Sequence, residues 1–155
     1  MLKNIFFTVN FTFILMFSAF AQTTKTLVLP KPAPDTPPGN IQLIETYTHT
    51  RKKGIDTIVG EISKPGGLTI HYDNGPLAGL VAGRICGQDN CLWYKRQKVN
   101  ENDVYLGFRA DGFIVATFPK DYVNFYAHTK TQEEIADFLI MILTYKNSEK
   151  AFPNK

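Results

Sequence analysis

The chain has few of the residues on which most metal and redox sites depend. Its 155 residues include two cysteines, three histidines and one tryptophan. Two cysteines would need two further ligands at matching spacing to form a structural zinc site. They are also too few for a densely cross-linked secreted scaffold, so the fold must rest on a hydrophobic core.

The chain also lacks the motifs that identify common enzyme classes. It contains no Gly-x-Ser-x-Gly, His-Glu-x-x-His, Gly-x-Gly-x-x-Gly or P-loop pattern. We therefore expect no cofactor and lean towards a protein that is not an enzyme. Small nucleases and lysozyme-like proteins carry sites without any local motif, so catalysis stays open as an alternative.

Charge of one sign is not concentrated anywhere in the chain. The formal net charge is +3, and removal of an N-terminal segment containing Lys3 would lower it to about +2. Nucleic-acid-binding domains carry a stronger positive charge that clusters on one face. We expect no nucleic-acid partner.

One long apolar run is present, and it lies at the N-terminus. Lys3 precedes an apolar stretch over residues 5–17, and small residues at Ala19 and Ala21 complete a signal-peptidase site. The run is shorter than the roughly 20 residues of a membrane-spanning helix, which is the alternative. The pattern predicts a signal peptide over residues 1–21, a secreted or periplasmic location, and no membrane span after cleavage.

Proline is concentrated in one segment. Five prolines fall between residues 30 and 38, and proline removes the N–H that a helix or central strand requires. We predict a Pro-rich linker over residues 22–39, a single domain over residues 40–148, and a tail over residues 149–155.

The two cysteines, Cys86 and Cys91, flank a run of turn-forming residues. In an exported protein this spacing predicts a disulfide that closes a tight loop. A redox or metal-binding pair is the alternative, although redox pairs usually have two intervening residues.

Short β-branched and aromatic segments separated by turn signals predict about eight strands. Residues 77–85 are small and apolar and predict a strand buried on both faces, with close backbone approach at Gly79 and Gly83. A helix contact through these glycines is the other interpretation. Asp111-Gly112 predicts a two-residue hairpin turn. The other predicted strands cover residues 41–50, 55–62, 68–73, 93–98, 103–108, 113–118 and 122–128.

One helix follows the strands. Thr131 and Glu134 form a capping box, and an apolar stripe then recurs at helical spacing over residues 135–143. Ile140 and Met141 extend that stripe, so we expect more than half of the helix circumference to be buried. Strands in sequence without helical crossovers predict an α+β fold: an antiparallel, strongly curved sheet or small barrel with the C-terminal helix packed against it.

The three histidines are the catalytic candidates. His49, His71 and His128 each fall near the end of a predicted strand, where sites are often built. Their convergence would suit zinc binding or acid–base cleavage of a phosphodiester, with Glu45 or Glu61 as carboxylate and Arg84 as phosphate ligand. The alternative is ordinary exposed imidazoles, because the spacing matches no compact metal motif.

The candidate binding surface combines aromatic rings with cations. A base, a sugar or an anionic partner would suit that combination, whereas the alternative is a solvated edge strand guarded by its lysines. A second aromatic patch is expected where Tyr122, Asn124 and Tyr126 share a face with His128. The residues of the first surface are Trp93, Tyr94, Lys95, Arg96 and Lys98.

These observations favour an exported, non-enzymatic binding module with an unknown protein or small molecule as its ligand. One alternative is a small secreted hydrolase acting on a phosphodiester or glycan through histidine and carboxylate residues. Another is an inhibitor or immunity protein for a periplasmic enzyme.

Overall fold

The computed structural model describes residues 36–87 and 90–146. These residues form seven strands and two α-helices, preceded by a single 3-10 turn at Pro38–Asn40. The elements are β1 (Thr48–Lys52), β2 (Ile58–Ser63), β3 (Thr69–Asn74), α1 (Val81–Cys86), β4 (Trp93–Val99), β5 (Asn102–Phe108), β6 (Phe113–Phe118), β7 (Val123–His128) and α2 (Gln132–Leu143).

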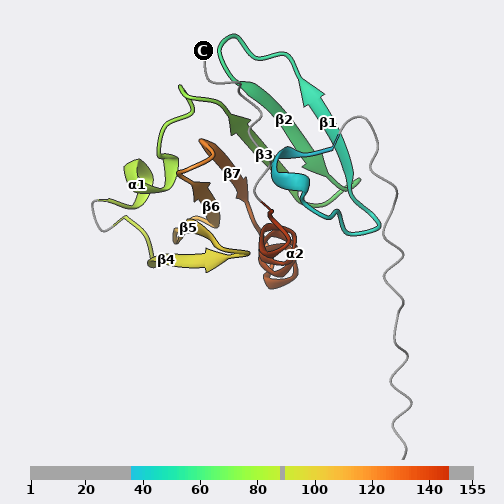
Figure 1. Ribbon diagram of the computed structural model, residues 1–155. Helices are drawn as coiled ribbons and strands as arrows, with labels where there is room; N and C mark the ends of the chain where they lie inside the picture. Colours follow the sequence, from blue (N-terminus) through green and yellow to red (C-terminus); the bar gives the residue numbers. More distant parts are fainter. Residues whose placement is uncertain (1–35, 88–89, 147–155) are drawn as a thin grey trace, which may run out of the picture.

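All seven strands belong to one antiparallel sheet, in the order β1-β2-β3-β7-β6-β5-β4. Two meanders, β1–β3 and β4–β7, meet where β3 pairs with β7. Figure 1 shows that the sheet curls but does not close, so β1 and β4 remain as its edges. The α+β prediction is confirmed, with seven strands rather than about eight and with an open sheet rather than a barrel.

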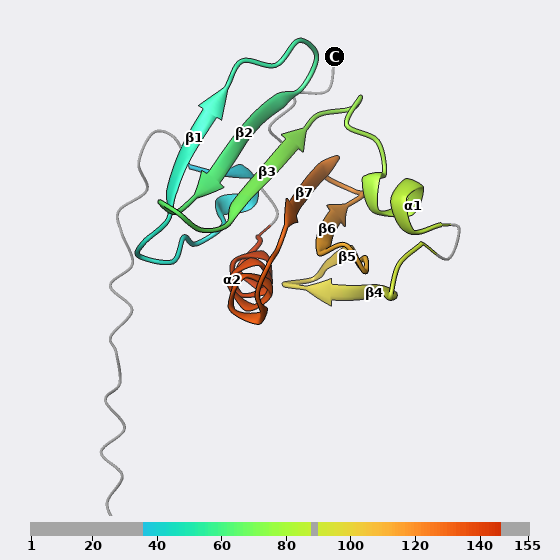
Figure 2. The ribbon, with the colours of Figure 1, turned by 180° about the vertical axis from the view of Figure 1, so that it is seen from behind.

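Each face of the sheet carries one helix, and we name the faces after these helices. The α2 face holds the main core, in which Ile70, Ile114 and Phe125 pack around Phe138 of the helix. The α1 face holds a smaller cluster around Ala82, Cys86 and Val115. Figures 1 and 2 show the two helices on opposite sides of the central strands.

The predicted strand over residues 77–85 is wrong. Residues 81–86 form α1 instead, and the preceding loop crosses the sheet. The helix fits closely because β5 has no side chain beneath it: a Cβ atom on Gly107 would lie 2.4 Å from Cys86 Sγ. A short run of small apolar residues has no clear period, so its pattern does not separate a buried strand from a helix.

The predicted disulfide is confirmed. Cys86 at the end of α1 is bonded to Cys91 just before β4, with a Cα–Cα distance of 5.1 Å. The bond therefore fastens the helix to the start of the edge strand. By restricting the unfolded chain, a disulfide that closes such a short loop stabilises the folded state by roughly 2 kcal/mol.

The first predicted strand, over residues 41–50, is mostly wrong, because β1 begins only at Thr48. The preceding segment instead packs against the core through buried Ile41 and Tyr47. The Tyr47 hydroxyl donates to Asp137 Oδ2 at 2.7 Å, and Lys64 Nζ donates to the same oxygen at 2.9 Å. Burial, together with that bond to Asp137, raises the pKa of Tyr47 to about 12.

The hairpin between β5 and β6 is confirmed, but its turn is longer than predicted. The Arg109 N–H donates to the Phe113 carbonyl at 2.9 Å, which leaves a loop of three residues, Ala110, Asp111 and Gly112. Gly112 has a φ of 83°, as three-residue hairpin loops usually require at their last position.

The predicted helix begins as expected, with Thr131 Oγ1 accepting from the Glu134 N–H at 3.2 Å. The Glu134 carboxylate accepts from the Lys130 N–H rather than from that of Thr131. Fewer of the apolar side chains are buried than predicted. Phe138, Met141 and Ile142 are buried, whereas Ile140 and Leu143 are more than half exposed.

The two ends of the described chain meet beside the core. The Lys146 N–H donates to the Gly39 carbonyl at 2.9 Å, and the Tyr145 ring stacks on Phe118. The predicted signal peptide, most of the predicted linker and the predicted tail lie outside the described residues. No helix within residues 36–87 and 90–146 is long and apolar enough to cross a membrane.

The burial of α2 predicts unequal effects for two alanine substitutions on the same helix. Phe138→Ala removes a fully buried ring and should lower the free energy of unfolding by about 3–5 kcal/mol. Ile140→Ala is the matched control, because the Ile140 side chain is 54% exposed. This substitution should lower the free energy of unfolding by less than about 1 kcal/mol. Urea unfolding measures both, and losses of similar size would contradict this placement of the helix.

Candidate functional site

The candidate binding residues all lie on β4, an edge strand of the sheet. The strand pairs with β5 over its whole length, from Trp93 opposite Phe108 to Val99 opposite Asn102. Five consecutive side chains are exposed: those of Tyr94, Lys95, Arg96, Gln97 and Lys98. The edge strand, which the sequence offered as the alternative interpretation, is therefore present. It is long and regular, and no other described strand pairs with its outer side.

Alternation divides the β4 side chains between the two faces. Trp93 lies on the α2 face, where its ring stacks on Phe108 with a centroid distance of 5.8 Å. Tyr94 lies on the α1 face and stacks on Tyr105 at 6.0 Å. The aromatic residues and the cations therefore do not form one patch. They line both sides of a single strand.

One carboxylate faces the β4 cations on the α1 face. Arg96 Nη2 lies 3.0 Å from Asp103 Oδ2, and its guanidinium lies over the Tyr105 ring at 5.9 Å. The hydrogen bond from Arg96, with further attraction from Lys98 and Lys120, lowers the pKa of Asp103. Asp103 is thus shared among several cations, and the edge remains positively charged.

The β4–β5 turn determines which backbone groups of the edge face outwards. Asn100 and Glu101 have φ angles of 45° and 69°, as a type I′ turn requires, and the pair that flanks a two-residue turn is hydrogen-bonded. Bonded and non-bonded pairs alternate along antiparallel strands. The N–H and C=O groups of Tyr94, Arg96 and Lys98 therefore point away from β5.

The three histidines do not come together. His49 lies on the α2 face, where its Nε2 is 2.8 Å from the Tyr72 hydroxyl. His71 and His128 lie on the α1 face, and the His128 ring packs edge-on against Phe113. No group of three histidine, cysteine, aspartate or glutamate side chains among the described residues is arranged to hold a metal ion.

One histidine has a carboxylate partner. His71 Nδ1 lies 3.2 Å from Glu61 Oε1, and the His71 ring stacks on Tyr126 at 5.7 Å. Lys52 binds the same Glu61 oxygen, and this hydrogen bond is the main reason that the pKa of Glu61 is lowered. Glu45, the other candidate carboxylate, is an exposed residue in the segment before β1.

The second expected patch is wrong at its centre, because Asn124 is completely buried. Its amide nitrogen donates to Asp73 Oδ1 at 2.7 Å and to the carbonyls of Ala78 and Gly79. Its amide oxygen accepts from the Thr117 hydroxyl at 2.6 Å and, more weakly, from the backbone N–H at the start of α1. Asn124 therefore holds the β3–α1 connection onto the sheet.

Asp73 is a polar group that sequence reasoning missed as a candidate. Partial burial raises its pKa above the ordinary value of 3.8, and the bond from Asn124 and the charge of Arg84 oppose that shift. Only the alternation within β3 signalled it, by placing Asp73 on the same face as His71. Arg84 is exposed on α1 and contributes its charge here.

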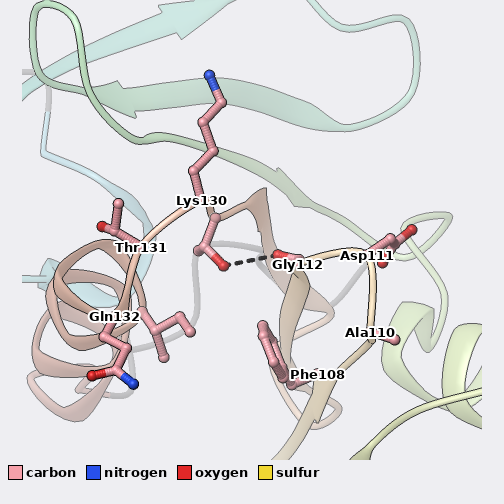
Figure 3. Close-up of a pocket in the computed structure, with 9 residues that line it drawn as sticks. Phe108, Ala110, Asp111, Gly112, Lys130, Thr131 and Gln132 are labelled. Carbon is pink, nitrogen blue, oxygen red and sulfur yellow. Dashed lines mark hydrogen bonds between the residues drawn. The ribbon is translucent and has the colours of Figure 1, made fainter.

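A hollow of about 370 Å³ lies between the β5–β6 loop and the start of α2 (Figure 3). Phe108 and Ile135 supply its apolar lining, and Thr129 Oγ1 donates to the Gly112 carbonyl at 2.9 Å across one side. Lys130 lines the hollow, but its side chain extends away from it in Figure 3. No sequence motif marks this hollow, because separate segments contribute to it.

Comparisons with protein-family models, with curated proteins and with solved structures find no match to this chain.

The raised pKa of Asp73 predicts a pH-dependent effect of removing its charge. The ionised carboxyl is disfavoured in the folded state, so its contribution to stability is fully present below the ordinary pKa of about 4 and is lost as the pH rises through the raised value. Asp73→Asn should therefore increase the free energy of unfolding at pH 7 and leave it nearly unchanged at pH 3.

Urea unfolding at the two pH values measures this effect, with Asp56→Asn in an exposed loop as the control. A loss of stability in Asp73→Asn at pH 7 would contradict it. That result would mean that the attraction of Arg84 outweighs the burial of the carboxylate.

Proposed function

We propose that this protein is an exported binding module that captures an extended polypeptide segment as an additional strand on β4. The observation that carries the proposal is the open, regular edge of β4, with three residues directing their backbone groups outwards. An edge strand of this kind is a template for pairing with another chain. Peptide-binding domains of several folds use this mode, in which backbone hydrogen bonds supply affinity and alternate side chains supply specificity.

Export is part of the proposal. It is supported by the N-terminal sequence over residues 1–21 and by the Cys86–Cys91 disulfide, because such bonds persist in oxidising compartments. An inhibitor or immunity protein for a periplasmic enzyme would be one form of such a module.

The second candidate is a small hydrolase, and the Glu61–His71 contact favours it. A carboxylate at Nδ1 fixes the tautomer that leaves Nε2 available as a base. However, Lys52 shares the carboxylate, His49 lies on the opposite face, and the hollow is lined by neither Glu61 nor His71. Strand addition accounts for more of the observed geometry.

The proposal predicts different effects for two substitutions of Arg96. Arg96→Ala removes the side chain but keeps the outward N–H, whereas Arg96→Pro also removes the N–H, which an edge position tolerates. For an end-capped peptide of alternating glutamate and valine, about ten residues long to match one strand, we expect Arg96→Pro to bind at least about tenfold more weakly than Arg96→Ala.

Trp93, the only tryptophan, lies within β4 and reports binding through its fluorescence. Thermal unfolding of both variants controls for folding, and the same peptide with alternate N-methyl groups controls for backbone pairing. Equal affinities for Arg96→Pro and Arg96→Ala would contradict strand addition.

A further inference from the structure

We infer that the segment captured by β4 is acidic, and that a second copy of this chain does not occupy the edge. This inference rests on the proposed function, because it concerns the chemistry of the partner at the same strand. It follows from the charges on the two edges and from the division of β4 into an aromatic and a cationic part.

The cationic part of β4 contains Lys95, Arg96 and Lys98. The Arg96 guanidinium lies 3.0 Å from the Asp103 carboxylate. Lys98 lies directly opposite Asp103 in the β4–β5 pairing, and its positive charge attracts the same carboxylate. Lys95 projects on the other face, and no carboxylate within residues 36–87 and 90–146 forms an ion pair with it. An incoming strand therefore meets excess positive charge on both of its faces.

The same charges oppose pairing between copies of the chain. The other edge, β1, carries Arg51 and Lys52, of which Lys52 is paired with Glu61. Any pairing of β4 or β1 with an edge of a second copy would bring two positive strands side by side, and like charges across a strand pair are destabilising. Natural proteins use lysine on edge strands to prevent such self-association.

The aromatic part of β4 indicates where an apolar residue of the segment would lie. Trp93 and Tyr94 present rings on opposite faces, and the Leu92 side chain beside them is 67% exposed. The cationic part of β4 begins at the next residue along the strand, Lys95. The expected partner is an extended segment with acidic residues opposite the cations and an apolar residue near Trp93 and Tyr94.

The test compares three end-capped peptides of about ten residues, in which glutamate, glutamine or lysine alternates with valine, by Trp93 fluorescence. We expect the glutamate peptide to bind about fivefold more tightly than the glutamine peptide, since its glutamates lie on one face of the added strand and can form two weak ion pairs, with Arg96 and Lys98. The variant with Lys95→Gln, Arg96→Gln and Lys98→Gln should bind both about equally. The control variant Arg51→Gln and Lys52→Gln, on the other edge, should retain the preference.

Tight and equal binding of the glutamate and glutamine peptides, still blocked by Arg96→Pro, would overturn the acidic partner and leave strand addition intact. Absence of binding by all three peptides would overturn both proposals. Tighter binding of a thymidine oligonucleotide than of the glutamate peptide would also overturn the inference. So would a dimer in sedimentation velocity that dissociates in the variant with Lys95→Gln, Arg96→Gln and Lys98→Gln.

Discussion

The structure depends on how one buried amide, that of Asn124, holds the connection between the two meanders. Asn124 lies on β7, next to the junction with β3, and hydrogen-bonds to the other meander through Asp73. It also accepts from Thr117 on β6 and donates to the backbone of the crossing loop. A buried amide without these partners would cost on the order of 1–3 kcal/mol or more, so the loop and α1 remain against the sheet.

The path of this connection decides which strand is left at the edge. Because the chain leaves β3 across the α1 face, the second meander starts at the far side of the sheet and returns to pair with β3. Among the strands that the structure describes, the first strand of that meander, β4, therefore has a neighbour on one side only. The Cys86–Cys91 bond fixes its start, and the turn at Asn100 and Glu101 fixes its end. The edge is thus held at both ends before any partner binds, which reduces the ordering cost of binding.

Much of the fold could be predicted from the sequence, because local signals agreed with the tertiary structure. Thr131 and Glu134 marked the start of α2, and the short β-branched and aromatic segment over residues 122–128 predicted the strand that forms β7. The edge position of β4 was the alternative interpretation of its lysines, and the structure has it at the edge of the sheet. The wrong predictions concerned residues whose role depends on partners far away in the sequence. Helix α1 is allowed by Gly107, which is far along the chain, and Asn124 is polar but buried because a loop covers it.

Amide hydrogen exchange along β4, followed by NMR, tests the central claim most directly. In the free protein we predict alternation: the outward amides of Tyr94, Arg96 and Lys98 exchange rapidly, whereas those of Lys95 and Gln97, bonded to β5, are protected. Addition of the glutamate–valine peptide should protect the outward set alone. Uniform protection of β4 in the free protein, or a bound peptide that leaves the outward amides unprotected, would contradict strand addition at this edge.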